Sequence, residues 1–161
     1  MSVPTTGDEL AGIVDLFGAL TREELGDALG ELAFKHGEEV DNAAVEAAVD
    51  DAIEGYYLVA VDHGGTTLLA PGPVAFPTLP GGAEDLPHIL DVPTRSVERA
   101  VLTEAAERQF RADAARAVDS NADADERIER LLDVSYDLET WGSADVSGVR
   151  RRLDDALGNR N

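Results

Sequence analysis

The segment YYLVAVDHGGTTLLAPGP (residues 56–73) interrupts a chain that is otherwise rich in helical patterns. Residues 56–61 are aromatic and β-branched, a composition typical of a strand. HGG at 63–65 predicts a tight turn, and residues 66–70 have the composition of a returning strand. The segment therefore predicts a two-stranded β-hairpin.

Three helical patterns precede this hairpin. The first is predicted from residue 8 to residue 19. The second begins after Thr21 and ends before Gly37, and the third begins at residue 41 or 42 and ends before Gly55. Thr21 and Glu24 have the spacing of a capping box, which marks the start of the second helix. Apolar residues recur at helical spacing in all three: Leu10, Ile13, Val14 and Phe17; Leu25, Leu29, Leu32 and Ala33; Val45, Ala48, Val49, Ala52 and Ile53.

Prolines punctuate the chain after the hairpin, and they forbid long regular elements there because they lack an amide proton. They are Pro71, Pro73, Pro77, Pro80, Pro87 and Pro93. Within this stretch, the apolar residues of LPHILDV (86–92) are expected to anchor the chain to the core. We divide the chain into residues 1–75 with the helices and hairpin, a Pro-rich connection at 76–93, and a helical region at 94–161.

The C-terminal region contains three further helical patterns, predicted at 94–119, 123–141 and 143–157. Their apolar residues are Val97, Val101, Ala105 and Phe110; Ile128, Leu131, Leu132, Leu138 and Trp141; Val146, Val149, Leu153 and Leu157. The predicted fold class is mainly α with a small antiparallel β-hairpin.

Three helices followed by a hairpin is the element order of a winged helix-turn-helix domain. The stretch LFGALTREEL resembles the start of haloarchaeal winged-helix proteins, and LLAPGPVAFPTLPGGAEDLPHILDV resembles a small haloarchaeal family without an assigned activity. The resemblance covers most of the chain and implies a winged-helix-like N-terminal domain with C-terminal helices. Its motifs carry no catalytic residue.

The charge of the chain is strongly negative, with 33 acidic residues against 13 basic ones and a formal net charge of -20. Lys35 is the single lysine beside twelve arginines. Such self-repulsion destabilises a compact state in dilute buffer, whereas molar salt shortens the Debye length to about 3 Å. Because the acids are spread along the chain, we interpret them as a halophilic adaptation. The alternative is an acidic nucleic-acid mimic or a partner of a basic protein.

The same charge argues against DNA binding by the N-terminal domain. A winged helix reads DNA with its last helix, which here would be residues 41–54. That segment has five acids, Asn42 as its one amide side chain, and no Arg, Lys or Gln. The hairpin has neither Lys nor Arg, and salt screening weakens repulsion from phosphates without creating contacts. We expect the hairpin to have the shape of a wing but not to bind DNA.

The C-terminal region is more balanced, with 11 Arg against 15 acids over residues 95–161. Arg150, Arg151 and Arg152 form its one basic run and are the candidate nucleic-acid contact, although successive helical residues point in different directions. Other arginines lie at helical spacing from acids, which predicts intrahelical ion pairs: Arg95, Arg99, Arg108 and Arg111 with Glu98, Glu104 and Glu107.

No pattern of catalytic, cofactor-binding or metal-ligating residues emerges from the sequence. His36, His63 and His88 are scattered, and there is no cysteine. Residues 119–130 resemble a calcium loop, but Ala124 replaces the glycine of the sharp turn and Arg130 replaces the bidentate glutamate. We therefore expect no enzyme, no cofactor and no metal.

The function predicted from the sequence is a non-enzymatic interaction or adaptor module that binds a protein partner or forms a homodimer. The alternative is a winged-helix transcription regulator that contacts DNA through Arg150, Arg151 and Arg152. The chain lacks a long apolar run and shows no secretory signal, so we expect a cytoplasmic protein without a membrane segment.

Overall fold

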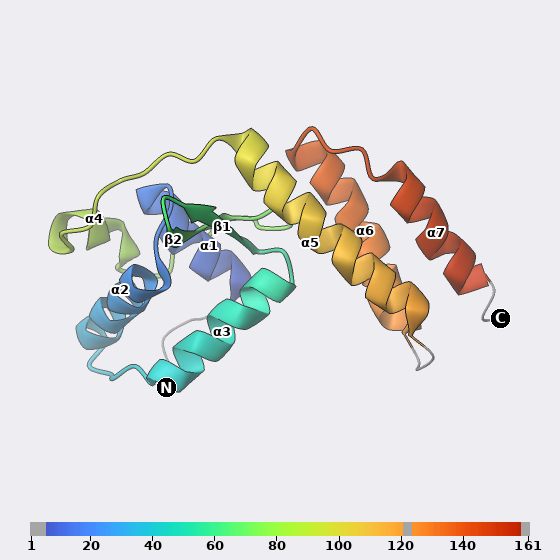
Figure 1. Ribbon diagram of the computed structural model, residues 1–161. Coiled ribbons are helices and arrows are strands. Elements are labelled where there is room, and N and C mark those ends of the chain that lie inside the picture. The colour runs from blue at the N-terminus through green and yellow to red at the C-terminus, as the bar shows by residue number, and fades with distance from the viewer. Residues whose placement is uncertain (1–5, 121–123, 159–161) are drawn as a thin grey trace. The chain divides into compact units, whose positions relative to one another are not determined.

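The computed structural model describes residues 6–120 and 124–158. Over these ranges the chain is mainly helical with one two-stranded antiparallel hairpin (Figure 1), which confirms the predicted fold class. It divides into two compact units, Met1–Glu98 and Arg99–Asn161. The connection expected at 76–93 thus falls within the first unit.

The first unit begins with three helices, α1 Gly7–Phe17, α2 Arg22–Lys35 and α3 Asn42–Glu54. Thr21 and Glu24 close the predicted capping box, and Thr6 and Glu9 close a second one at the start of α1. Asp41 caps α3 through the backbone N–H of Ala43 at 3.0 Å. The three starts are therefore fixed by side chains that satisfy amide groups left free at a helix N-terminus.

The core of the first unit is built from the predicted stripes of these helices, together with the hairpin and the connection. The fully buried large side chains are Leu10, Ile13, Phe17, Leu20, Leu25, Leu29, Leu32, Leu58, Leu69 and Leu86. Because Leu86 comes from the connection, the expected anchoring by LPHILDV is confirmed. A one-turn helix, α4 Leu86–Ile89, follows the 3₁₀ turn Ala83–Asp85 in that segment.

The hairpin pairs β1 Leu58–His63 with β2 Thr66–Pro71, and Val61 lies opposite Leu68. Gly64 and Gly65 both adopt positive φ, at 60° and 84°, as a two-residue turn matched to strand twist requires. Leu20, between α1 and α2, exchanges two backbone hydrogen bonds with Leu69 of β2 at 3.0 and 2.7 Å. This bridge ties the hairpin to the helices.

The first strand begins two residues later than predicted, because Tyr56 and Tyr57 terminate α3. The N–H of Tyr57 donates to the carbonyl of Ala52 at 2.9 Å, and that of Tyr56 donates to Ile53 at 3.1 Å. These two bonds form a Schellman motif, in which the left-handed position is usually glycine. Here Tyr56 occupies it with φ of 68° while its side chain is buried.

The connection packs against the backbone of α1 at positions where only glycine leaves space. A Cβ on Gly12 would lie 2.2 Å from the carbonyl oxygen of Thr78, and one on Gly18 would lie 1.8 Å from that of Arg95. The N–H of Arg95 also donates to the carbonyl of Phe17 at 2.8 Å. These contacts place residues 76–95 with the first unit.

The second unit consists of α5 Arg99–Asp119, α6 Asp125–Trp141 and α7 Ser147–Gly158. The first of these begins five residues later than predicted, because the backbone of Arg95 bonds to α1 instead of to a helical turn. The buried residues of this unit include Leu102, Ala106, Phe110, Ala114, Ala117, Ile128, Leu131, Val134, Leu138, Val146, Val149 and Leu153. The predicted stripe on α5 was wrong in part, since Val101 is exposed while Leu102 is buried.

Candidate functional site

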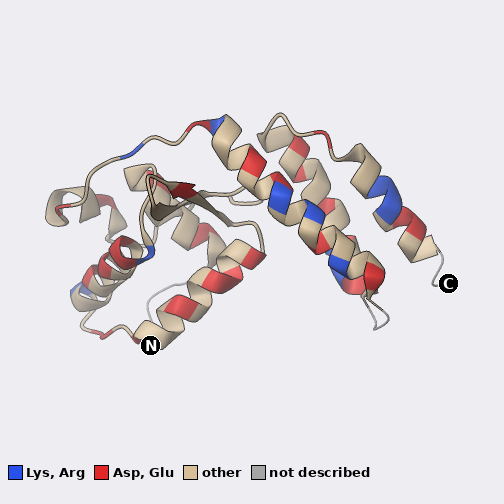
Figure 2. Ribbon diagram, in the orientation of Figure 1, with Lys and Arg blue, Asp and Glu red and all other residues tan. Residues whose placement is uncertain are grey.

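The exposed face of α3 is acidic (Figure 2), and it lies where a DNA-binding winged helix would carry basic side chains. Its exposed residues are Asn42, Ala43, Ala44, Glu46, Ala47, Asp50, Asp51 and Glu54. The buried side is the predicted stripe, with Val45, Val49 and Ala52. The face therefore offers carboxylates and small side chains, and no cation.

Each cation of the first unit is bound by a carboxylate. Arg22 donates to Glu46 at 2.9 Å and to Asp50 at 2.5 Å. Lys35 lies 3.9 Å from Asp85 and donates to the carbonyl of Gly82. With three basic and 19 acidic residues, the unit has a net charge of -16, and its few cations are already engaged.

Arg95 is the third of these cations, and it binds Glu24 with both of its terminal nitrogens, at 2.6 and 3.0 Å. The hydrogen bond from Arg95, reinforced by those from Thr21, holds the pKa of Glu24 below its usual value of 4.5 despite partial burial. The predicted intrahelical role of Arg95 was wrong, because the residue precedes α5 and reaches across to α2.

The hairpin offers no basic contact. Its tip residues from Asp62 to Thr67 are exposed and include one carboxylate and His63. Side chains on the strands of the hairpin are buried next to those that enter the core of the first unit: Val59, Val61, Leu68 and Ala70. The structure thus supplies neither cations nor an open apolar strand face at this position.

A groove of about 380 Å³ lies beside the acidic face of α3. It is lined by the start of α1, by α3 and by the last residue of the C-terminal motif of α3: Gly7, Ala44, Ala47, Ala48, Asp51, Ala52 and Tyr57. Asp51 is the one charged residue of this lining. Sequence patterns place its alanines on α3, but they do not reveal that Gly7 and Tyr57 complete the groove.

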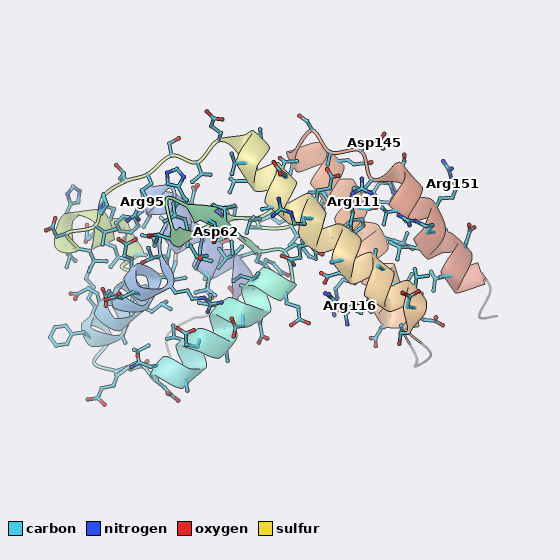
Figure 3. The ribbon with its side chains drawn as sticks, in the orientation of Figure 1. Asp62, Arg95, Arg111, Arg116, Asp145 and Arg151 are labelled. Atoms are coloured by element: carbon cyan, nitrogen blue, oxygen red, sulfur yellow. The ribbon has the colours of Figure 1, made fainter. Side chains whose placement is uncertain are left out.

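The structure separates the three arginines predicted as a nucleic-acid contact. Arg150 is half-buried: its side chain donates to Ser135 at 2.9 Å and to Glu139, and its guanidinium lies 4.1 Å from the ring centre of Tyr136. By contrast, Arg151 and Arg152 are exposed, and Arg151 extends outward from α7 (Figure 3). The basic run therefore does not form one face.

Glu139 joins α6 to the start of α7. Besides binding Arg150, it accepts a hydrogen bond from the backbone N–H of Val146 at 3.0 Å. The hydrogen bond from Arg150, followed by that of Val146, lowers the pKa of Glu139. Arg150 is thus part of the packing between α6 and α7.

Most other arginines of the second unit are also engaged. Arg108 pairs with Glu104 at 3.1 Å and Arg111 with Glu107 at 2.9 Å, which confirms the predicted intrahelical ion pairs. Arg99 instead stacks 4.5 Å from the ring centre of Trp141. Besides Arg99, the arginines for which no ion pair exists among the described residues are Arg127, Arg130, Arg151 and Arg152.

The second unit contains a cavity of its own. It has a volume of about 480 Å³ and is lined by α5, where Arg108 pairs with Glu104 and Arg111 with Glu107, and by Ser143 and Ala144. No group of three or more metal-ligating side chains gathers within residues 6–120 and 124–158, and no helix there is long and apolar enough to cross a membrane. Asn121 and Asp123 of the calcium-like loop lie outside these residues.

Comparison with known proteins identifies a family but no activity. No curated protein and no solved structure matches the chain. A family model described as a family of unknown function, DUF7109, matches residues 8–158, and the chain therefore belongs to that family.

Proposed function

We propose that the protein is a non-enzymatic interaction module, built on a winged-helix-like domain, that binds a basic protein partner through the exposed face of α3. The observation that carries this proposal is the chemistry of that face, where every exposed charge is a carboxylate. Since each cation of the first unit is ion-paired, the partner must supply the positive charge.

The charge also selects among protein partners. A homodimer that joined two α3 faces would place carboxylates against carboxylates, and like charges in an interface cost affinity. A basic segment of another protein avoids this repulsion, and its cations can form ion pairs with Asp51 and Glu54. The α3 face therefore fits a partner of opposite charge better than its own copy.

The environment that we propose is the salt-rich cytoplasm of a haloarchaeon. The support is a net charge of -20 with twelve arginines and one lysine. In molar salt the exposed acids of α3 do not steer a partner over long distances, because the Debye length is about 3 Å. Binding must then come from direct contacts, which makes the shape of the face as important as its charge.

The experiment is affinity purification of the tagged protein from a halophilic host in molar KCl, with and without nuclease. We expect a stoichiometric basic protein that survives nuclease and is lost from an Asp51→Lys/Glu54→Lys variant. The matched control reverses two exposed acids on α2, Glu23→Lys/Asp27→Lys, and should retain the partner. Recovery of the same partner by both variants would exclude the α3 face as the binding surface.

A second candidate function is DNA binding by the C-terminal helices, and it is supported by the free arginines of that unit. Arg151 and Arg152 are exposed without an ion pair among the described residues, and Arg127 and Arg130 share this state on α6. The test is DNA binding by an Arg151→Ala/Arg152→Ala variant, which leaves the structural Arg150 intact. Unchanged affinity in that variant would remove the support for this function.

A further inference from the structure

We propose that the groove between α1 and α3 receives an arginine side chain of the basic partner. This inference rests on the proposed function and names the chemistry of the contact. The guanidinium would bind the carboxylate of Asp51 and stack on the ring of Tyr57, and the alanines of α3 would enclose its aliphatic stem.

The carboxylates on the exposed face of α3 differ in whether they already have a cationic partner. Glu46 and Asp50 lie one turn apart and are bridged by Arg22, so each already has a cationic partner. Ala44, Ala47 and Asp51 follow one another at spacings of three and four and line the groove. No ion pair joins Asp51 to a described residue, which leaves its carboxylate open to an external cation.

The ring of Tyr57 is held in place by close contact with two glycines. A Cβ on Gly7 would lie 2.3 Å from Cγ of the tyrosine ring, so the ring packs directly on the backbone of α1. A Cβ on Gly55 would meet the same ring at 3.2 Å. A ring clamped in this way loses little further entropy when it stacks on a ligand, which favours binding.

A tyrosine and a carboxylate already hold an arginine elsewhere in this chain. In the second unit, Tyr136 and Glu139 together hold the guanidinium of Arg150, with 4.1 Å from the guanidinium carbon to the ring centre. The groove offers the same two groups, a tyrosine and a carboxylate, but no arginine of the described residues fills it. Its volume of about 380 Å³ leaves room for one.

Arginine fits this groove better than lysine does. Its planar guanidinium can bind a carboxylate with two nitrogens while it stacks on an aromatic ring, and it is more weakly hydrated than an ammonium group. Weak hydration matters in molar potassium chloride, where a carboxylate is surrounded by competing cations. A lysine would gain little there beyond what potassium already provides.

The test titrates the full-length, ¹⁵N-labelled protein with three synthetic helical peptides that carry arginine, lysine or glutamine at the same positions. Amide shifts of α3 and Tyr57 report binding in molar KCl. We expect the arginine peptide to bind at least about fivefold more tightly than the lysine peptide, because of the stacking and fork geometry. The glutamine peptide should not bind.

Two matched pairs of variants locate the contact. Asp51→Asn should weaken the arginine peptide about tenfold, while Asp50→Asn, outside the groove, should have little effect. Ala47→Leu fills the groove and should abolish binding, whereas Ala43→Leu on the same helix should not. All four substitutions lie at exposed positions, so the folded state should survive in each variant.

Equal binding of the arginine and lysine peptides, or equal effects within either pair of variants, would overturn the arginine site. That result leaves the proposed function standing if the purified partner is still lost on reversal of Asp51 and Glu54. Conversely, peptide binding that follows the predicted pattern while no partner is recovered from cells would preserve the site and contradict the interaction module. The two failures are therefore distinguishable.

Discussion

Arg95 and Glu24 lie 71 residues apart in sequence and form a bidentate ion pair with nitrogen–oxygen distances of 2.6 and 3.0 Å. Glu24 at the same time accepts the N–H of Thr21 at 2.9 Å to close the capping box of α2. Arg95 also donates to the carbonyl of Ala19 at 3.3 Å. One carboxylate thus fixes a helix start and fastens the connection to it.

Replacing Glu24 with Gln should destabilise the first unit in a pH-dependent way. Gln preserves the capping box but removes the charge that binds Arg95, so we expect a loss of about 1.5–3 kcal/mol at neutral pH. Because the pKa of Glu24 is lowered in the folded state, its contribution is present above the usual value of 4.5 and disappears as the pH falls through the lower folded value. Denaturant unfolding at several pH values should show the free energies of unfolding of wild type and Glu24→Gln converging as the pH falls.

Glu23, its exposed neighbour, provides the control for this experiment. Glu23→Gln should change the free energy of unfolding by less than about 0.5 kcal/mol at every pH. If the difference in free energy of unfolding between wild type and Glu24→Gln stays constant through the acid range, the assigned ion pair is contradicted.

Gly12→Ala should separate the connection from α1. The new methyl group would lie 2.2 Å from the carbonyl oxygen of Thr78, which forces a backbone shift and should cost about 1–3 kcal/mol. Gly30→Ala lies inside α2, where the added carbon meets no heavy atom within 4 Å apart from its chain neighbours and the helix's own backbone, and should instead gain about 0.5–1 kcal/mol. If thermal unfolding shifts both variants in the same direction, the close approach at Gly12 is wrong.

Arg150→Lys should loosen the second unit, since lysine cannot bind Glu139 and Ser135 together while stacking on Tyr136. We expect a loss of about 1–3 kcal/mol, measured through the fluorescence of Trp141, the single tryptophan of the chain. Arg151→Lys is the matched control and should leave the transition unchanged, because Arg151 is exposed. Equal behaviour of the two variants would mean that Arg150 is not a structural residue.

Salt should stabilise the first unit more than the second, because their net charges are -16 and -4. Between about 0.1 M and 1 M KCl the Debye length falls from about 10 Å to about 3 Å, which removes most repulsion between exposed acids. Hydrogen exchange at both salt concentrations should show the larger gain of protection in α2 and α3. A Glu23→Gln/Asp27→Asn variant should need less salt to reach the same protection. If the salt requirement is unchanged, repulsion between exposed acids is not the cause of the salt dependence.

The acidic face of α3 could be predicted from the sequence, but the groove beside it could not. Glu46, Asp50, Asp51 and Glu54 avoid the apolar stripe, so helical periodicity alone places them on the outside. The groove needs Gly7 and Tyr57 to meet α3, and no periodic pattern encodes a meeting between separate elements. The same limit applies to Arg150, whose place in a basic run gave no sign that it packs between two helices.

The features that could be predicted from the sequence are local: the helix starts after Thr21 and at residue 41 or 42, the turn at Gly64 and Gly65, and the apolar stripes. Each depends on side chains and backbone groups within a few residues of one another, so short-range chemistry suffices to predict them. The tertiary structure decided which distant groups meet, including Arg95 with Glu24 and the left-handed Tyr56 that delays the first strand. These features arise because a buried ring or a paired charge outweighs local preference once the elements pack.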